Sequence, residues 1–550
     1  MIDSGTGVRT IPSSSSARRS IVVAFWNRYR ERSCKRFAFT RARAALCRSF
    51  AALARSRSSC SGARGRGAGG KTARSDGADV GTLSWRGSMA PRTARAGIRV
   101  VGCASRNTKI AARPSVRFVK VYVEAYGCTQ NYGEARLMQE ALRGSGHTIT
   151  TAEADADAHV LVTCTVVETT ERKMARRMAE LAVYQKPFVV AGCMAAAQRD
   201  RVQSIVPRAK LLPPRKWPQI VELLGAGTAC GDRAAEVEST AFGWRDAIVP
   251  IAQGCAGRCT YCITRVARGR VASYGIDSIV GQVRGHVERG VREIKLTGQD
   301  TAAYGLDTGT NLAALLRAIA EIPGEFRVRV GMADPLTAYP IQEELVAAYA
   351  SDKLFKFLHL PVQSGDDAIL ESMQRQYTVS EFEEIVRRFR RTFPEITLST
   401  DVIVGFPGES EEQFEATMEL VRRVRPDIVN VTRFSPREGT PAATMPGRIV
   451  GWKVKERSRR LTRLRFQIAR EMNERFIGRE ATVLVTEPGK PGTVLARTPE
   501  YRQVVLREPA AIGEFLRVKI DGARPTDLSG YLLTNGLYTA VQIHAGSPVV

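Results

Sequence analysis

Short apolar segments alternate with segments of helical spacing in three successive units of the chain. Runs of β-branched and aromatic residues predict buried strands at 118–126, 159–163 and 188–191. A helix is expected after each strand, and the first of them spans 131–143 and ends at Gly144. Strands and helices that alternate in this way predict a parallel, doubly wound sheet.

The same alternation then repeats six times along the middle of the chain. The expected strands are 247–252, 293–296, 326–330, 355–360, 397–404 and 428–434. Helices expected between them include 312–322, 341–350, 380–393 and 410–424. Six strand–helix units predict a βα-barrel, complete or partial, whose chemistry collects at the C-terminal ends of its strands.

A basic helix is expected after the barrel. Arg448 to Arg479 carries eleven Lys and Arg residues against three Asp and Glu residues. Apolar residues at helical spacing predict one buried face, which leaves most of the basic side chains on the other faces. The buried positions are Leu461, Leu464, Ile468 and Met472, and the basic positions are Arg459, Arg460, Arg463 and Arg470. Such a face either binds RNA or is simply solvated.

Five short strands separated by Gly and Pro turns predict a small C-terminal β-barrel. The strands are expected at 481–485, 492–497, 502–506, 515–520 and 530–534. Small barrels of this kind often bind single-stranded or looped RNA through basic and aromatic side chains. Candidate contacts of that type are Arg497, Tyr501 and Arg502.

The first 115 residues are rich in Arg, Ser, Ala and Gly, and they lack sustained apolar periodicity. We expect this segment to be disordered, because it cannot bury enough apolar surface to offset its ordering entropy. Three explanations stay open: an organelle transit peptide, an RNA-binding arm, or a translation start assigned too far upstream. In the last case initiation lies at Met89 or near Val116.

The net charge of +27 comes mostly from that segment, which holds 24 Lys and Arg residues against 4 Asp and Glu residues. The other 435 residues carry 58 basic against 51 acidic side chains, so charge alone does not indicate nucleic-acid binding. Eleven dispersed cysteines in so long a chain favour reduced thiols in a cytoplasmic location over a secreted disulfide scaffold. No apolar run approaches eighteen residues, so we expect a soluble protein with no membrane partner.

Three cysteines form a C-x3-C-x2-C motif in the loop after the first strand of the barrel. Cys255, Cys259 and Cys262 lie beside Gly254 and Gly257, which let the backbone wrap around a small inorganic group. Three thiolates leave a fourth metal position open, whereas a structural zinc site needs four closed ligands. An iron-sulfur cluster with one open iron is therefore favoured over zinc or a merely structural group.

Three further cysteines each follow a predicted strand of the first sheet. They are Cys128, Cys164 and Cys193. Because the C-terminal ends of parallel strands lie along one edge, these thiols are expected to meet in space. The hypothesis is a second three-thiolate iron-sulfur site, and the alternative is that buried cysteines occupy strand ends by chance.

Six short motifs are grouped at these predicted strand ends. They read Tyr-Gly-Cys-Thr-Gln-Asn (126–131), Val-Thr-Cys-Thr-Val (162–166), Ala-Gly-Cys-Met (191–194), the 253–270 loop, His-Leu-Pro-Val-Gln-Ser-Gly (359–365) and Val-Gly-Phe-Pro-Gly-Glu (404–409). Together they resemble the motifs of the radical S-adenosylmethionine (SAM) methylthiotransferases. The resemblance covers roughly 117–545 and includes a terminal module similar to the TRAM domain.

This resemblance implies two 4Fe-4S clusters, with SAM as co-substrate. Cys255, Cys259 and Cys262 would hold the cluster that cleaves SAM, and Cys128, Cys164 and Cys193 would hold an auxiliary cluster. Other barrel loops supply candidate SAM-binding residues, namely Gly298, Gln299, Gln363, Gly405, Phe406 and Gly408. His359 lies in an apolar strand and is interpreted as a core histidine rather than a ligand.

The stretch Leu-Thr-Gly-Gln-Asp-Thr-Ala-Ala-Tyr-Gly (296–305) is closest to the archaeal and eukaryotic branch of this family. That branch implies methylthio transfer to C2 of N6-threonylcarbamoyladenosine at position 37, in the anticodon loop of tRNA. The alternatives are N6-isopentenyladenosine, a ribosomal-protein aspartate, or a zinc-holding RNA-binding protein without catalysis. A monomer served by a low-potential electron donor and a sulfur donor is expected.

We therefore expect five parts in the chain. They are a disordered extension (1–115), a methylthiotransferase domain (116–228), a radical SAM barrel (245–447), a basic helical linker (448–478) and a TRAM-like RNA-binding domain (479–546).

Overall fold

The computed structural model describes residues 119–166, 168–224 and 246–533. All of them belong to one compact unit of the chain. The expected extension and Met89 lie outside the described residues, as does the stretch between the first two expected domains. No helix in the described part of the chain is both long enough and apolar enough to span a membrane.

The first domain contains a five-stranded parallel sheet with the order β2-β1-β3-β4-β5. Its strands are β1 (Lys120–Ala125), β2 (Thr148–Thr150), β3 (Ala158–Thr163), β4 (Phe188–Gly192) and β5 (Lys210–Leu212). The three predicted strands form its centre, and the short edge strands β2 and β5 were not predicted. The doubly wound fold is thus confirmed, and its strand order reverses between β1 and β3.

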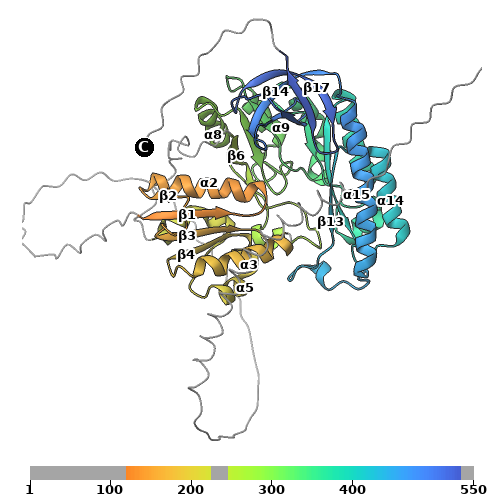
Figure 1. The fold of residues 1–550 in the computed structure, drawn as a ribbon. Helices are drawn as coiled ribbons and strands as arrows, with labels where there is room; N and C mark the ends of the chain where they lie inside the picture. Colours follow the sequence, from red (N-terminus) through yellow and green to blue (C-terminus); the bar gives the residue numbers. More distant parts are fainter. Residues whose placement is uncertain (1–118, 167, 225–245, 534–550) are drawn as a thin grey trace, which may run out of the picture. The chain divides into compact units, whose positions relative to one another are not determined.

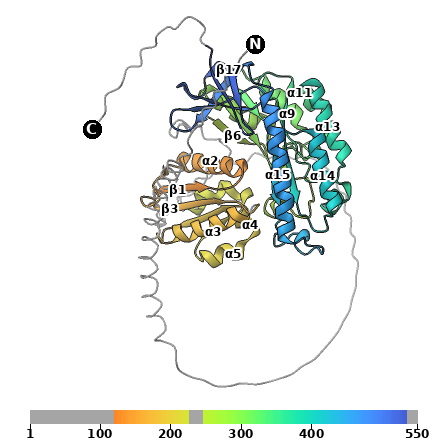
Figure 2. The same ribbon diagram turned by 45° about the vertical axis from the view of Figure 1, so that its right-hand side comes forward.

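Helices cover both faces of this sheet, α2 on one side and α3 with α5 on the other (Figure 1, Figure 2). The helices are α2 (Thr129–Gly144), α3 (Glu168–Ala182), α4 (Cys193–Ala197), α5 (Arg199–Ile205), the 3-10 helix η1 (Pro214–Gln219) and α6 (Ile220–Leu223). Met138 and Leu142 of α2 pack on Val121 and Val160 of the sheet. Met174 and Met178 of α3 instead pack with Leu161 on the opposite face.

Two three-stranded parallel sheets form the central domain, with the orders β10-β9-β6 and β11-β12-β13. The strands are β6 (Asp246–Pro250), β9 (Glu293–Thr297), β10 (Arg327–Arg329), β11 (Phe357–His359), β12 (Thr397–Val404) and β13 (Ile428–Arg433). A parallel bridge between Val328 and Leu354 joins the two sheets into an open arc. The predicted partial barrel is confirmed, and each of its six expected strands is present.

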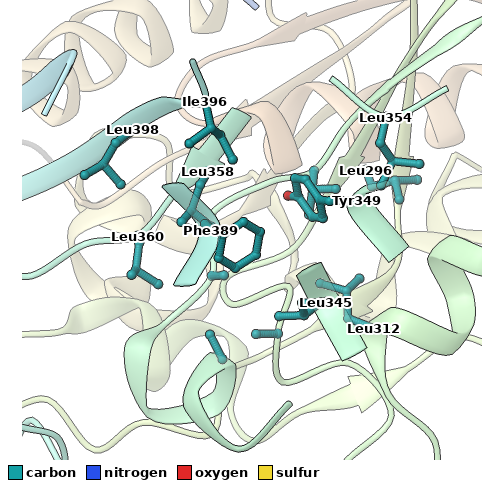
Figure 3. Packing of buried hydrophobic residues seen from close by; sticks show 14 of the residues in the cluster. Leu296, Leu312, Leu345, Tyr349, Leu354, Leu358, Leu360, Phe389, Ile396 and Leu398 are labelled. Atoms are coloured by element: carbon teal, nitrogen blue, oxygen red, sulfur yellow. The ribbon is translucent and has the colours of Figure 1, made fainter. Parts of the chain in front are cut away.

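The helices of this domain pack their apolar sides on the arc. They are α7 (Ile263–Arg268), α8 (Ile276–Glu288), α9 (Leu312–Ala320), α10 (Pro335–Ala338), α11 (Gln342–Tyr349), α12 (Asp367–Ser372), α13 (Val379–Thr392) and α14 (Glu411–Val424). Short elements are β7 (Ala252–Gln253), β8 (Ala272–Ser273), η3 (Tyr339–Ile341) and η4 (Pro441–Ala443). In the core, Leu358 and Leu398 are neighbours across β11 and β12, and Phe389 of α13 packs beside them (Figure 3).

The basic helix α15 (Gly451–Glu474) runs beside α14 (Figure 1, Figure 2). Arg459, Arg463 and Arg470 are exposed, as expected. Arg460 is half-buried and forms ion pairs with Glu411 and Glu415 of α14, so its expected position on a solvated face is wrong. The basic character of α15 therefore serves packing within the chain as well as its surface.

The last five strands close into a barrel with the order β14-β15-β16-β18-β17, which confirms the predicted small barrel. They are β14 (Glu480–Pro488), β15 (Val494–Arg497), β16 (Gln503–Leu506), β17 (Phe515–Ala523) and β18 (Leu528–Leu532). Val483, Val504 and Val518 fill its interior.

One of the three candidate RNA contacts in this barrel, Arg502, is wrong, and contact of Tyr501 with RNA stays a prediction. Tyr501 packs against the rings of Phe355 and Phe357, with centroids 4.8 and 5.1 Å away. Arg502 is 6% exposed and donates hydrogen bonds to Asp427 and to the Asn473 side chain. Both residues dock the barrel on the central domain, because side chains on a small barrel serve its neighbours as readily as a ligand.

Replacing Arg502 with Met is expected to destabilise the protein. The change leaves the carboxylate of Asp427 buried without its cation, which costs about 3 kcal/mol or more. Arg517→Met is the control, because Arg517 and its ion-pair partner Glu480 are both exposed on the same barrel, and such pairs contribute less than about 1 kcal/mol. Thermal unfolding followed by circular dichroism measures both variants. Equal melting temperatures for the two would contradict this account of Arg502.

Candidate functional site

Three cysteines lie at the C-terminal ends of the adjacent strands β1, β3 and β4. Cys128 precedes α2, Cys164 follows β3, and Cys193 begins α4. The first two flank the position where the strand order reverses, which is where ligands bind in open parallel sheets. The structure thus places all three predicted side chains at one edge of the sheet.

Close backbone contact brings these three thiols together. A methyl group on Gly127 would lie only 3.0 Å from the Cys164 sulfur, so the chain just before Cys128 touches Cys164. Burial raises the pKa of the Cys193 thiol to about 12. Arg268 opposes this shift, and the neighbouring thiolates of Cys128 and Cys164 add to it. The adjacent strands β1, β3 and β4 therefore carry the three cysteines side by side at their C-terminal ends.

The second trio gathers in the loop between β7 and α7. A methyl group on Gly257 would lie 3.5 Å from the sulfur of Cys255 and 3.6 Å from that of Cys259. Both sulfurs therefore lie within 3.6 Å of the same point beside Gly257. Burial raises the pKa of the Cys259 thiol, Arg375 opposes this, and the Cys262 thiolate adds to it. The backbone N–H of Cys262 donates to the Cys259 carbonyl at 3.2 Å, so the third cysteine lies in the same turn.

Arg268, at the end of α7, connects the two trios. Its side chain is 1% exposed, and its Nε donates a hydrogen bond to the Cys193 sulfur at 3.3 Å. Glu134 of α2 accepts from both terminal nitrogens of this guanidinium. Further hydrogen bonds go to Asn131 at 2.8 Å and to Gln253 at 2.7 Å. A residue six positions after Cys262 thus contacts the trio of the other domain.

The charge of Arg268 persists despite its burial. Burial lowers the pKa of the guanidinium, but attraction to Glu134 and to the Cys193 thiolate outweighs this and leaves the pKa raised. A permanent cation therefore lies against a thiol of the first trio.

Arg375 has the corresponding position beside the second trio. Its Nη1 donates to the Cys259 sulfur at 3.3 Å and pairs with Asp334 at 2.6 Å. Asp334 in turn donates its backbone N–H to Asp300 at 2.9 Å. Burial raises the pKa of the Asp300 carboxyl to about 7, and the charge of Asp334 adds to this. Both cysteine trios are thus bordered by buried, hydrogen-bonded ionic groups.

Sequence reasoning missed both arginines. Arg268 lies in the cysteine loop that was singled out, but its partner Glu134 is 134 residues away. Arg375 is 116 residues from Cys259. The helical spacing of α2 does contain one indication, because it places the charged residue Glu134 on the buried side of the helix, where a carboxylate needs a cationic partner.

The predicted SAM-binding residues have varied surroundings. Gln299 accepts a hydrogen bond from the Gly254 backbone at 2.7 Å and so shapes the cysteine loop, while Gly298 lies beside it. Gln363 has a positive φ of 70° and donates its N–H to the Asp401 carbonyl at 2.8 Å. Gly408 has open space around its Cα. The assignment of these residues to SAM stays a prediction.

Gly405 and Phe406 also have packing roles. A side chain on Gly405 would lie 2.6 Å from Val454 of α15, so this glycine allows the helix to approach. Phe406 is fully buried between Tyr261 and Phe434, with ring centroids 6.4 and 5.4 Å away. Their contact with SAM likewise stays a prediction.

His359 lies at the end of β11 and is half-buried. Its Nε2 is 3.0 Å from a carboxylate oxygen of Asp401 on β12. His359 is therefore held by a polar contact with the Asp401 carboxylate rather than by packing in an apolar core.

The donor sets fit an iron-sulfur cluster at each trio. Each offers three thiols and one guanidinium hydrogen bond, which stabilises the negative charge that a thiolate-bound cluster carries. Within the described ranges, no three His, Cys, Asp or Glu side chains are arranged around a point as for a single metal ion. The fit therefore depends on the chemistry of the donors, three thiols and one guanidinium at each trio.

Three family models match successive parts of the chain. The Radical SAM superfamily matches residues 249–421, which include Cys255, Cys259 and Cys262. The Uncharacterized protein family UPF0004 matches residues 120–212 and contains the other trio. The TRAM domain matches residues 474–533, the terminal barrel with the end of α15.

Two archaeal relatives match the chain along nearly their whole length, and a vertebrate relative matches it along about three quarters. The probable threonylcarbamoyladenosine tRNA methylthiotransferase of Pyrococcus horikoshii is 43% identical over 433 residues, which are 76% of this chain and 100% of the relative. The Archaeoglobus fulgidus protein with the same description is also 43% identical, over 75% of this chain and 99% of the relative. The threonylcarbamoyladenosine tRNA methylthiotransferase of Danio rerio is 34% identical, over 73% of this chain and 76% of the relative.

A solved structure of a radical S-adenosylmethionine methyltransferase, TsrM from Kitasatospora setae, has 14% identity and a TM-score of 0.46 over 60% of this chain and 77% of that chain. The sequence relatives, together with the three matched models, establish the family. The chain belongs to the radical SAM methylthiotransferases, in the branch of the threonylcarbamoyladenosine tRNA methylthiotransferases.

Proposed function

We propose that this protein transfers a methylthio group to C2 of N6-threonylcarbamoyladenosine at position 37 of tRNA, with SAM as co-substrate. The observation that carries the proposal is the pair of cysteine trios joined by Arg268 in a chain that spans the full Pyrococcus relative. The tRNA-2-methylthio-N(6)-dimethylallyladenosine synthase of Paracoccus denitrificans is also related, but at 32% identity rather than 43%. The threonylcarbamoyl substrate is therefore favoured over an isopentenyl one.

In this proposal Cys255, Cys259 and Cys262 hold the cluster that cleaves SAM. Cys128, Cys164 and Cys193 hold the auxiliary cluster. When bound, the first supplies an electron to SAM and the second supplies an iron that binds the sulfur to be transferred. The chain orients both through short loops at strand ends and excludes water by burying Cys164 and Cys193.

Arg268 and Arg375 would each tune one cluster. A hydrogen bond to a ligating sulfur withdraws negative charge and makes the cluster easier to reduce. Arg268 donates to Cys193 and Arg375 donates to Cys259, so the two effects are separate. Glu134 and Asp334 hold the guanidinium groups in place.

The wider setting follows from this chemistry. SAM cleavage consumes an electron and methylthio transfer consumes sulfur, so we propose a low-potential electron donor and a sulfur donor as partners. A monomer suffices because one chain carries both trios, and a tRNA substrate favours the cytoplasm. The proposed domain limits 116–228 and 245–447 enclose the first two matched models, whereas the TRAM match, 474–533, begins before the proposed limit of 479.

Loss of the gene is expected to remove 2-methylthio-N6-threonylcarbamoyladenosine from tRNA and leave its unmethylthiolated precursor. Mass spectrometry of tRNA nucleosides from a deletion strain measures both. Expression of the intact chain should restore the product, and the Cys255→Ala chain, as the control, should not. Loss of 2-methylthio-isopentenyladenosine instead, or unchanged tRNA with an altered ribosomal protein, would reassign the substrate.

Removing one cysteine from each trio should separate the two reactions. Cys259→Ala is expected to keep auxiliary-cluster iron while abolishing 5'-deoxyadenosine formation. Cys164→Ala should still form 5'-deoxyadenosine but transfer no methylthio group. Anaerobic iron and sulfide analysis combined with chromatography of the SAM products checks both. A colourless, zinc-loaded protein would instead favour the RNA-binding alternative.

Replacing each arginine with Gln should lower the reduction potential of its own cluster only. Arg268→Gln acts on the auxiliary cluster, and Arg375→Gln acts on the SAM-cleaving cluster. Redox titrations followed by electron paramagnetic resonance measure each potential. They use chains that keep the cysteines of one trio and have the three cysteines of the other trio changed to alanine. Iron content equal to the parent shows that the site is formed. A shift of both clusters by either variant contradicts separate tuning.

A further inference from the structure

A cavity of about 270 Å³ lies where the three matched domains meet. It is lined by Thr129, Tyr132, Ile248, Lys295, Arg329 and Tyr501. Thr129 directly follows Cys128, so the cavity adjoins the auxiliary trio along the chain. Tyr501 comes from the terminal barrel and closes the cavity from that side.

The cavity faces the inside of the partial barrel. Ile248, Lys295 and Arg329 are neighbours in register across β6, β9 and β10. The adjacent row, Ala247, Ile294 and Val328, belongs to the apolar core that packs with the helices. Because successive side chains of a strand point to opposite faces, the row with the two cations points away from the helices.

The charge of Lys295 is already compensated. Its ammonium group lies 3.0 Å from Asp246 and 3.2 Å from Glu293. Glu293 also accepts a hydrogen bond from the Tyr501 hydroxyl at 3.0 Å. Lys295 and its carboxylates therefore form a closed group that needs no further anion.

Arg329 has no such compensation. None of the residues that the structure describes accepts a hydrogen bond from its guanidinium, and its Nε is buried without a partner. The group stacks on the rings of Phe357 and Tyr501, with centroids 4.9 and 5.6 Å away. Aromatic stacking fixes the plane of the guanidinium but leaves its donors unused. A partly buried cation with unused donors is costly unless a ligand supplies the anion.

We propose that Arg329 binds the carboxylate of the threonylcarbamoyl group and thereby selects this nucleoside. The proposal rests on the function proposed above and adds to it the residue that reads the substrate. A planar carboxylate matches the fork of a guanidinium, whereas an isopentenyl group offers it nothing. One uncompensated cation also matches the single charge of the threonyl carboxylate.

An RNA phosphate is the other anion that the same donors would bind. The carboxylate is favoured because the cavity is small and is lined by Thr129, which directly follows Cys128 of the auxiliary trio. A phosphate contact would strengthen binding of every tRNA alike, since it carries no information on the modified base. The two sources are therefore separable by experiment.

The test compares two substrates with the reconstituted full chain. One is tRNA carrying threonylcarbamoyladenosine, and the other is the same tRNA with the threonyl carboxylate methylated. The wild type should use the acid at least about 100-fold better in kcat/KM, because an unpaired buried cation is left with the ester. Arg329→Gln should use both poorly and to the same extent, with its iron content and 5'-deoxyadenosine formation retained.

Arg327→Gln is the matched control. Arg327 is on the same strand and also stacks on an aromatic ring, that of Phe515 at 4.8 Å, but it does not line the cavity. It should keep the wild-type preference for the acid. Equal use of acid and ester by the wild type would overturn the proposal. An Arg329→Gln variant that binds modified and unmodified tRNA more weakly by the same factor would also overturn it and identify a phosphate contact.

Binding without turnover separates this proposal from the proposed function. Equilibrium dialysis of the free nucleoside and its methyl ester measures whether Arg329 selects the acid. A wild type that makes no methylthio product but still prefers the acid through Arg329 would remove the proposed reaction and keep the site. A wild type that makes the methylthio product but binds both nucleosides equally would keep the proposed reaction and overturn the role of Arg329.

Discussion

The ion pair between Arg268 and Glu134 is the interaction on which the rest of the site depends. Both side chains are at most 1% exposed, so either charge alone in that position would cost several kcal/mol. The pair joins the helix after one cysteine trio to the helix that begins beside the other. Two cysteine trios in separate domains can act on one substrate only if the distance between them is fixed, and this buried pair is one of the contacts that hold the domains together.

The strand ends and the cysteines were predictable because they depend on local information. A buried strand shows in four to six consecutive residues, and a Cys at its end inherits its position from the parallel sheet. The edge strands β2 and β5 were missed because each is three residues long and only partly buried. Helix α8 was missed although Ile279, Val283 and Val287 have helical spacing, because no prominent motif drew attention to it.

Contacts between domains could not be predicted in the same way. Tyr501 and Arg502 have the composition of an RNA-binding surface, yet the first fills an apolar gap beside Phe355 and the second pairs with Asp427. The same residue types suit both purposes, since an interface between domains and an interface with RNA both use aromatic and guanidinium groups. Only the position of the partner, 75 residues away for Arg502, distinguishes them.

The arginines of this protein show how that distinction is made. Arg268, Arg457 and Arg502 are nearly fully buried, and each is held by a carboxylate of another segment. Their charges are balanced within the chain by these carboxylates, so they stabilise the fold. Arg329 is stacked on aromatic rings at a cavity without any such carboxylate among the described residues. A cation whose orientation is fixed but whose charge is unbalanced is organised for an anion that arrives from outside, and this separates a binding arginine from a structural one.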